Sequence, residues 1–105
     1  MSASPAADIS EDRILETIAA IRASAPEITP IGGGLMAALH LGIAKDSRTF
    51  SRLLGIAHAL VLREIADLTE RDRLIRVVYR NSRTQRTEFA FTESGEALVE
   101  QATAA

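Results

Sequence analysis

The residues with the clearest chemical potential in this sequence are its arginines. Eleven of the twelve basic residues are Arg, and six of them fall within residues 71–86. The planar guanidinium group matches a phosphate with two parallel hydrogen bonds, whereas Lys is the more common residue where a charge serves only solubility. Six arginines in so short a segment therefore predict a surface that contacts phosphate groups, such as those of a nucleic-acid backbone.

The sequence offers few residues for enzymatic catalysis. Its two histidines, His40 and His58, lie far apart, and neither has a metal-binding residue three or four positions away. Cysteine is absent, and so are the Gly-x-Ser-x-Gly motif and the Walker phosphate-binding loop. We therefore expect no enzymatic activity, no metal site and no cofactor. His40 lies in an apolar segment, and we expect it to belong to the core or its boundary.

Composition and charge predict one small folded domain with a basic centre. The 105 residues are 47% hydrophobic and 25% charged, with a net charge of −2, which is typical of a single soluble domain. Residues 1–44 carry −3, residues 45–87 carry +5 and residues 88–105 carry −4. No apolar run approaches the ~18 residues of a membrane span, and the first residues lack the pattern of a signal peptide. These features predict a cytoplasmic protein with a positively charged working face.

An N-terminal helix is predicted after a short tail. Residues 1–9 are small and polar, and we expect them to be disordered, so that the folded domain spans residues 10–105. Ser10 suits an N-cap because two acidic residues follow it, and Pro26 should end the helix near Ser24. Apolar residues recur on one face of this helix at 10–24, namely Ile14, Leu15, Ile18 and Ile21. Such a stripe predicts packing against another surface.

Residues 26–34 are predicted to form a flexible connector, and residues 35–44 a buried helix. The connector contains two prolines and the run 32–34 of three glycines. No Gly-Lys-Ser or Gly-Lys-Thr follows these glycines, as a phosphate-binding loop would require. Residues 35–44 are apolar almost all round, which is typical of a helix in the centre of a domain.

A helix, a glycine turn and a second helix are predicted next. Asp46 or Ser47 can cap the first helix, and Gly55 suits the turn before a second helix at about 57–69. The residues expected to point inward are Phe50, Leu53 and Leu54 in the first helix, and Val61, Ile65 and Leu68 in the second.

The pattern then changes to that of strands. Residues 74–80 are rich in β-branched residues and residues 87–91 alternate between polar and apolar, which predicts a β-hairpin with the polar loop 81–86 at its tip. Thr92 suits the cap of a last helix. Its inward residues should be Ala97, Leu98 and Ala102.

The order of these elements resembles a winged helix-turn-helix, and four segments are similar to bacterial transcriptional regulators of the MarR type. Residues 50–68, with the sequence FSRLLGIAHALVLREIADL, resemble the helix-turn-helix of that family, and residues 69–77 resemble its link into the first wing strand. The loop 81–86 lies where the family has its basic wing tip, and residues 91–98, FTESGEAL, resemble its Leu-Thr-x-x-Gly-x-x-Leu closing motif. The resemblance covers residues 35–100. It implies a mainly α-helical fold with a two-stranded β-wing that binds double-stranded DNA and regulates transcription.

The resemblance also implies which residues meet DNA. The helix at 57–69 would enter the major groove, and the wing at 80–87 would contact the backbone or the minor groove. The outward positions of that helix are mostly Ala and Leu, which offer contact only to thymine methyl groups, so we expect a narrow or weak sequence preference. The expected DNA-binding residues are Arg48, Arg52, His58, Ala59, Leu62, Arg63, Arg80, Arg83 and Arg86.

Two further expectations concern protein partners. The MarR family pairs its subunits through terminal helices, so the resemblance implies a homodimer. The residues expected at its interface are Ile14, Leu15, Ile18 and Ile21. An alternative function is that of a winged-helix adaptor, which would bind a protein partner through Leu60 and Leu62, although the arginine-rich loop argues against it. We expect Leu62 to be the more accessible of the two, with Leu60 partly in the core.

Overall fold

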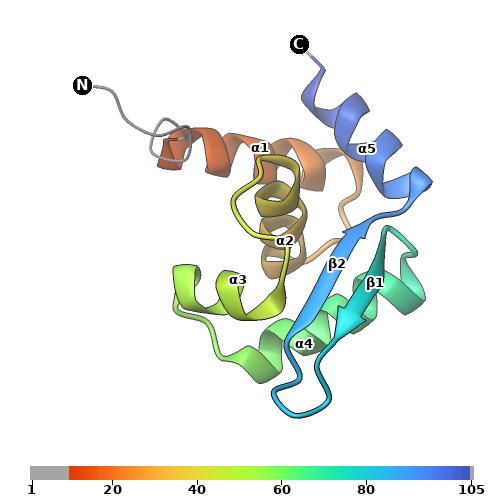
Figure 1. The fold of residues 1–105 in the computed structure, drawn as a ribbon. Helices are drawn as coiled ribbons and strands as arrows, with labels where there is room; N and C mark the ends of the chain where they lie inside the picture. The colour runs from red at the N-terminus through yellow and green to blue at the C-terminus, as the bar shows by residue number, and fades with distance from the viewer. Residues whose placement is uncertain (1–9, 105) are drawn as a thin grey trace.

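The computed structural model describes residues 10–104, so the tail expected at 1–9 lies outside the described residues. The described part is mainly helical, with a two-stranded antiparallel sheet, and its elements follow the predicted order (Figure 1). They are α1 (Glu11–Ser24), α2 (Pro30–His40), α3 (Ser47–Leu54), α4 (His58–Ala66), the π-helical turn η1 (Asp67–Arg71), β1 (Ile75–Arg80), β2 (Thr87–Phe91) and α5 (Glu93–Thr103). None of the described helices is long and apolar enough to cross a membrane.

Side-chain caps fix where four of the described helices begin. The hydroxyl oxygens of Ser10, Thr29 and Thr92 each accept a hydrogen bond from a backbone N–H in the first turn of α1, α2 and α5. The carboxylate of Asp46 does the same at the start of α3. α3 ends at Gly55, whose φ of 65° lies in the left-handed region that glycine adopts without strain. The caps predicted at Ser10 and Thr92 and the turn predicted at Gly55 are therefore confirmed, and of the two residues predicted as possible caps of α3 it is Asp46, not Ser47, that caps the helix.

The three consecutive glycines are not a flexible connector, and that prediction is wrong. They lie in the first half of α2 and are buried, with Pro30 in the first turn. A Cβ atom on Gly33 would lie 3.2 Å from both Ile18 and Arg22 of α1, and one on Gly34 would lie 3.3 Å from the ring of Phe50. The glycines thus allow α1 and α3 to approach the backbone of α2. This close packing offsets the roughly 1 kcal/mol that each glycine costs inside a helix.

The core forms around α2, which packs against α1 and α4, while α5 also packs against α1 (Figure 1). Among the described residues, the large side chains buried completely are Ile21, Ile28, Leu35, Met36, Phe50, Val61, Ile65, Leu68, Ile75 and Val99. The inward positions predicted for α4 and η1 are therefore confirmed. Ile21 belongs to this core and has no exposed surface to offer a second subunit.

Several residues expected inside lie outside. Leu53 is 57% exposed and Leu54 is 51% exposed, because on this side of the short helix α3 the core covers Phe50 but not the two leucines. His40 is exposed at the C-terminal end of α2, where the helix emerges from the core. In α5 the buried residues are Gly95 and Val99, and the predicted Leu98 and Ala102 are half-buried against the core, whereas the predicted Ala97 is exposed. These expectations were wrong because helical spacing defines a common face but not whether a neighbouring element covers it.

The hairpin is antiparallel with an irregular register. Val77 pairs with Phe89 and Tyr79 with Glu88, so Val78 is an extra residue on β1 and forms a β-bulge. Beyond the bulge, Arg80 pairs with Thr87. Strict alternation from Ile75 would have placed Arg80 on the opposite face of the sheet, and the bulge instead turns it to the face that bears the buried Thr87.

A short third segment extends the sheet beyond the hairpin. Asp46 forms an isolated antiparallel bridge with Glu88, and the N–H of Phe89 donates to the carbonyl of Lys45 at 3.0 Å. The residues just before α3 are thus bonded to β2. This contact holds the start of α3 against the hairpin.

Candidate nucleic-acid interface

The start of α3, the start of α4 and the hairpin loop meet at one end of the molecule, where the loop extends beyond α4 (Figure 1). The backbone N–H of Thr87 donates to the Ser47 hydroxyl at 2.9 Å. Nη2 of Arg48 donates to the carbonyl of Thr84 in the loop at 3.2 Å. Two side chains of α3 therefore reach the hairpin, and the arginines of both elements lie on one connected unit.

The hairpin loop, residues 81–86, is ordered by its own hydrogen bonds. Oδ1 of Asn81 accepts from the N–H groups of Arg83 and Thr84, at 2.9 and 3.0 Å. Gln85 has a positive φ of 64°, and its N–H donates to the carbonyl of Asn81 at 2.7 Å. These contacts present Arg83 to solvent at the tip on a constrained backbone. Arg83 therefore lies where a phosphate-binding residue was expected.

Arg86 lies at the base of the loop and is held by two carboxylates. Its Nη2 is 2.7 Å from Glu88, and its Nε is 3.5 Å from Asp46. Burial raises the pKa of Asp46, but hydrogen bonds from Thr49 and Arg48, together with the charge of Arg86, outweigh burial and hold that pKa below its ordinary value. The geometry thus gives Arg86 a structural role, in contrast to the exposed Arg83.

His58 also has a partner inside the chain. Its Nε2 lies 2.7 Å from the hydroxyl of Ser47, which leaves the other ring nitrogen without a partner among the described residues. Burial and the nearby charge of Arg48 lower the pKa of His58, against an opposing effect of Asp46. His58, at the start of α4, therefore takes part through Ser47 in the contact between α3 and the hairpin.

The outward surface of α4 has few hydrogen-bond donors. Ala59, Leu60 and Arg63 are exposed, and Leu62 is half-buried. With 39% of its surface exposed, Leu60 is the more accessible leucine, contrary to the expectation from the sequence. Leu60 lies about 100° around the helix from the core residue Val61, so its side chain lies at the edge of the buried face. Arg63 is thus the one exposed side chain of α4 that can donate to a base edge.

The remaining arginines of this region lie on α3, on β1 and in the turn before β1. Arg48 and Arg52 are exposed on α3, and Arg80 donates from Nε to the Thr87 hydroxyl at 3.2 Å near the loop. Arg71 instead pairs with Asp72 at 3.2 Å, before β1 begins. Arg71 and Arg80, which belong to one run in the sequence, therefore lie at opposite ends of β1.

An apolar groove lies on another side of the molecule, between α1 and α3. Ile14, Leu15 and Ile18 line it from α1, and Leu53 and Leu54 line it from α3, around a cavity of about 270 Å³. Leu15 is 58% exposed. Three of the four residues expected at a dimer interface thus lie at this surface, together with two leucines that were expected inside.

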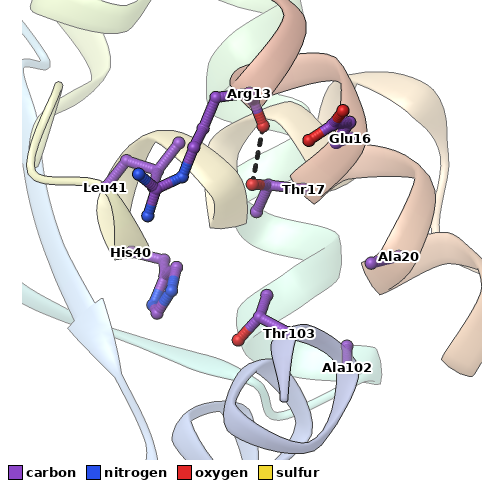
Figure 2. A pocket seen from close by; sticks show the side chains of 8 residues that line it. All are labelled: Arg13, Glu16, Thr17, Ala20, His40, Leu41, Ala102 and Thr103. Carbon is purple, nitrogen blue, oxygen red and sulfur yellow. Dashed lines mark hydrogen bonds between the residues drawn. The ribbon is translucent and has the colours of Figure 1, made fainter. Parts of the chain in front are cut away.

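A polar cleft of about 260 Å³ lies between α1, the end of α2 and α5. Figure 2 shows the side chain of Arg13 extending from α1 toward the end of α2, where His40 lies. The hydroxyls of Thr17 and Thr103 donate to carbonyls of their own helices, at 2.8 and 2.7 Å. The cleft therefore contains two exposed basic groups but no buried polar side chain in need of a ligand.

The contacts that sequence reasoning missed join residues far apart in the chain. Ser47 and Thr87, and likewise Asp46 and Arg86, are about 40 positions apart, and no local pattern signals their pairing. Comparison with known proteins finds no matching family model, curated protein or solved structure. The chemistry available at this end of the molecule is that of exposed guanidinium groups on a constrained loop, beside a helix with a largely apolar outer surface.

Proposed function

We propose that this chain is a winged-helix DNA-binding protein that regulates transcription, similar in design to the MarR type. In this proposal α3, Gly55 and α4 form the helix-turn-helix, and β1, β2 and their loop form the wing. The short bridge at Asp46 and the antiparallel hairpin support this design, because they attach a wing to the helix-turn-helix. α4 would enter the major groove, and the wing would contact the DNA backbone or the minor groove.

The observation that carries the proposal is the attachment of the arginine-bearing loop to α3. The Arg48–Thr84 and Ser47–Thr87 hydrogen bonds hold the loop beside the exposed start of α4. Arg48 and Arg83 are then arranged before DNA arrives, so that less conformational freedom is lost on binding. Phosphate contacts of this kind provide affinity and orientation without reading the sequence.

Base recognition would rest on a small number of contacts. Arg63 can donate two hydrogen bonds to a guanine, and Ala59 and Leu60 can touch thymine methyl groups. Leu60 also supports the alternative function, since an exposed leucine on α4 is a suitable contact for a protein partner. We therefore expect DNA binding to combine a strong salt dependence with modest sequence discrimination.

We further propose that two copies pair through the groove between α1 and α3. Leu15, Leu53 and Leu54 expose apolar surface there. In α3, Leu53 and Leu54 lie on the same side of the helix as Phe50, whereas Arg48 and Arg52 lie on the opposite side. Pairing through the leucines would therefore leave these arginines free for DNA. A dimer of this kind would bind two half-sites related by a two-fold axis.

Salt-dependent binding to a random-sequence duplex tests the DNA-binding proposal. Fluorescence anisotropy at several salt concentrations gives the slope of log K against log salt, whose magnitude reflects how many phosphates the protein neutralises, at about 0.9 per phosphate. Arg83→Ala should reduce affinity for every sequence and reduce the magnitude of the slope by about 0.9, the value for one phosphate. Arg13→Ala, an equal change of charge in α1, is the matched control and should leave the slope unchanged.

Arg86 is unsuitable for this test, because Arg86→Ala would also remove the partner of Asp46 and disturb the start of α3. An unmutated protein that binds duplex DNA without salt dependence, or not at all, refutes the proposal. Equal slopes for Arg83→Ala and the unmutated protein would instead remove the wing from the mechanism.

A further inference from the structure

The hydroxyl of Ser47 joins three elements of the fold. Ser47 is fully buried at the start of α3. Its oxygen accepts from the backbone N–H of Thr87 in β2 at 2.9 Å, and the same oxygen lies 2.7 Å from Nε2 of His58 in α4. We call this set of two hydrogen bonds the Ser47 joint. It is the place where the proposed wing and α4 are held to each other through a single side chain.

The donors and acceptors of Ser47, His58 and Thr87 determine where the hydrogens of the Ser47 joint lie. A hydroxyl has one hydrogen to donate and two lone pairs to accept with. Thr87 occupies one lone pair, so the Ser47 hydrogen is satisfied when it points at an unprotonated Nε2. If Nε2 carried a hydrogen, both ring and backbone would donate to Ser47, and the buried hydroxyl hydrogen would have no acceptor among the described residues. A buried donor without a partner is unfavourable.

We infer that His58 is held in the neutral form with its hydrogen on Nδ1, and that protonation of His58 loosens the Ser47 joint. In this role His58 is a positioning residue: it sets how firmly β2 is attached to α3 and α4, and it makes that attachment depend on pH. The Ser47 joint is formed by residues of this chain and needs no DNA, whereas its effect on DNA binding rests on the proposed function.

The charges around His58 are consistent with this role. From the start of α3, Arg48 disfavours the imidazolium and Asp46 favours it. From the hairpin, Arg86 pairs with Asp46 and with Glu88, so the charge of Asp46 is already partly neutralised. Arg63 is the nearest charged residue that follows His58 within α4. Because burial and Arg48 keep the pKa of His58 below its ordinary value of 6.5, the joint is intact at neutral pH and opens as the solution becomes acidic.

Nuclear magnetic resonance on the free protein tests the joint directly. The chain has two histidines, so His40→Gln, at an exposed position, leaves His58 as the sole imidazole. Its ¹⁵N spectrum at neutral pH should show Nδ1 protonated and Nε2 unprotonated. Amide exchange should show the protection factor of Thr87 falling about two- to tenfold as His58 becomes protonated, the effect of losing one hydrogen bond. The amide of Leu74, which donates to Leu68 outside the joint, is the control and should not follow this titration.

Two variants separate this inference from a simple packing role. His58→Gln on the His40→Gln background should remove the pH dependence of Thr87 protection. Ser47→Ala on the same background should move the pKa of His58 up toward its ordinary value, because the neutral ring loses its donor. A neutral-pH spectrum with hydrogen on Nε2, or Thr87 protection that ignores the charge of His58, overturns the inference.

A DNA measurement then tests the consequence separately. If the proposed function is right, loosening the joint should reduce the contribution of Arg83, so the affinity ratio between the unmutated protein and Arg83→Ala should be smaller at pH 5 than at pH 7.5. His58→Gln should keep that ratio constant. Failure of DNA binding refutes the proposed function but leaves the spectroscopic result standing, whereas a constant ratio in the unmutated protein refutes the coupling alone.

Discussion

Replacing Gly95 with alanine tests how α5 is attached to the rest of the fold. A Cβ atom at this position would lie 1.9 Å from the carbonyl oxygen of Leu74, whereas ordinary van der Waals contact begins at 3.4 Å. The obstacle is backbone, so it cannot rotate away as a side chain would. The first turn of α5 would have to move by more than an ångström to admit one methyl group.

The magnitude follows from what that movement breaks. Thr92 holds α5 in place, since its N–H donates to the carbonyl of Leu74 at 3.1 Å and its hydroxyl donates to the carbonyl of Arg73 at 2.8 Å. Losing these two hydrogen bonds costs about 1–3 kcal/mol in total, and forced overpacking costs about 1–3 kcal/mol. Alanine is the better helix former by about 1 kcal/mol, which opposes both effects. We therefore expect a net loss of about 1–5 kcal/mol in the free energy of unfolding.

Urea unfolding followed by circular dichroism measures this loss. Ser94→Ala is the matched control, because Ser94 is exposed in the same turn and alanine there should change stability by less than about 0.5 kcal/mol. If Gly95→Ala is as stable as the unmutated protein, then α5 does not approach Leu74 as described, and the reasoning fails.

Three further predictions concern the proposed surfaces and the acidic cap. Leu15→Asp combined with Leu53→Asp should leave the chain folded but convert a dimer to a monomer in light scattering; an unmutated protein that is already monomeric at high micromolar concentration contradicts the proposed pairing. Arg63→Ala should reduce discrimination between specific and random DNA by about 1–3 kcal/mol in a footprinting or competition assay. If there is no footprint, but a captured protein partner is lost with Leu60→Asp, the adaptor function replaces DNA binding. Asp46→Asn should destabilise the fold by about 1–2 kcal/mol at neutral pH, because the amide lacks the charge that pairs with Arg86 and keeps only one acceptor oxygen for Thr49 and Arg48. Because the folded protein lowers the pKa of Asp46, this stabilisation is present above the ordinary value of 3.8 and disappears as the pH falls through the folded value. Unfolding curves of the two proteins should therefore converge in acid.

Local signals predicted most of the element order in the described residues. Capping residues and turn glycines act within a few positions, so Ser10, Asp46, Gly55 and Thr92 were sufficient to place the boundaries of α1, α3 and α5. The alternation at 87–91 likewise predicted β2. These features depend on backbone hydrogen bonds that are local in the chain.

The wrong predictions for the glycine run and for Leu53 have a common cause: both depend on contacts between elements that are distant in the sequence. Three adjacent glycines weaken a helix in isolation, but in α2 the space they leave is filled by α1 and Phe50, so packing overrides propensity. Leu53 was expected inside because it shares a face with Phe50, yet no element in the described residues covers that part of the face.

The residue types of the candidate interface could be predicted from the sequence, but which of its arginines are exposed and which are held by carboxylates could not. The concentration of arginines between 71 and 86 is evident in the sequence. Two other features depend on pairings between distant parts of the chain. Arg86 is held by Asp46, and a bulge at Val78 turns Arg80 to the face of Thr87. Residue types therefore indicated the region, and the structure distinguished the exposed Arg83 from the engaged Arg86.

The attachment of the hairpin to the start of α3 also has a consequence for the order of folding. The Ser47–Thr87 hydrogen bond closes a loop of 40 residues, whereas the hairpin and the α3–α4 pair each form from residues close together in the chain. Bringing distant residues together costs chain entropy before any interaction compensates for it. We therefore expect these local units to form early and to dock late. Substitutions at Ser47 or Thr87 would then chiefly accelerate unfolding, with little effect on the rate of folding.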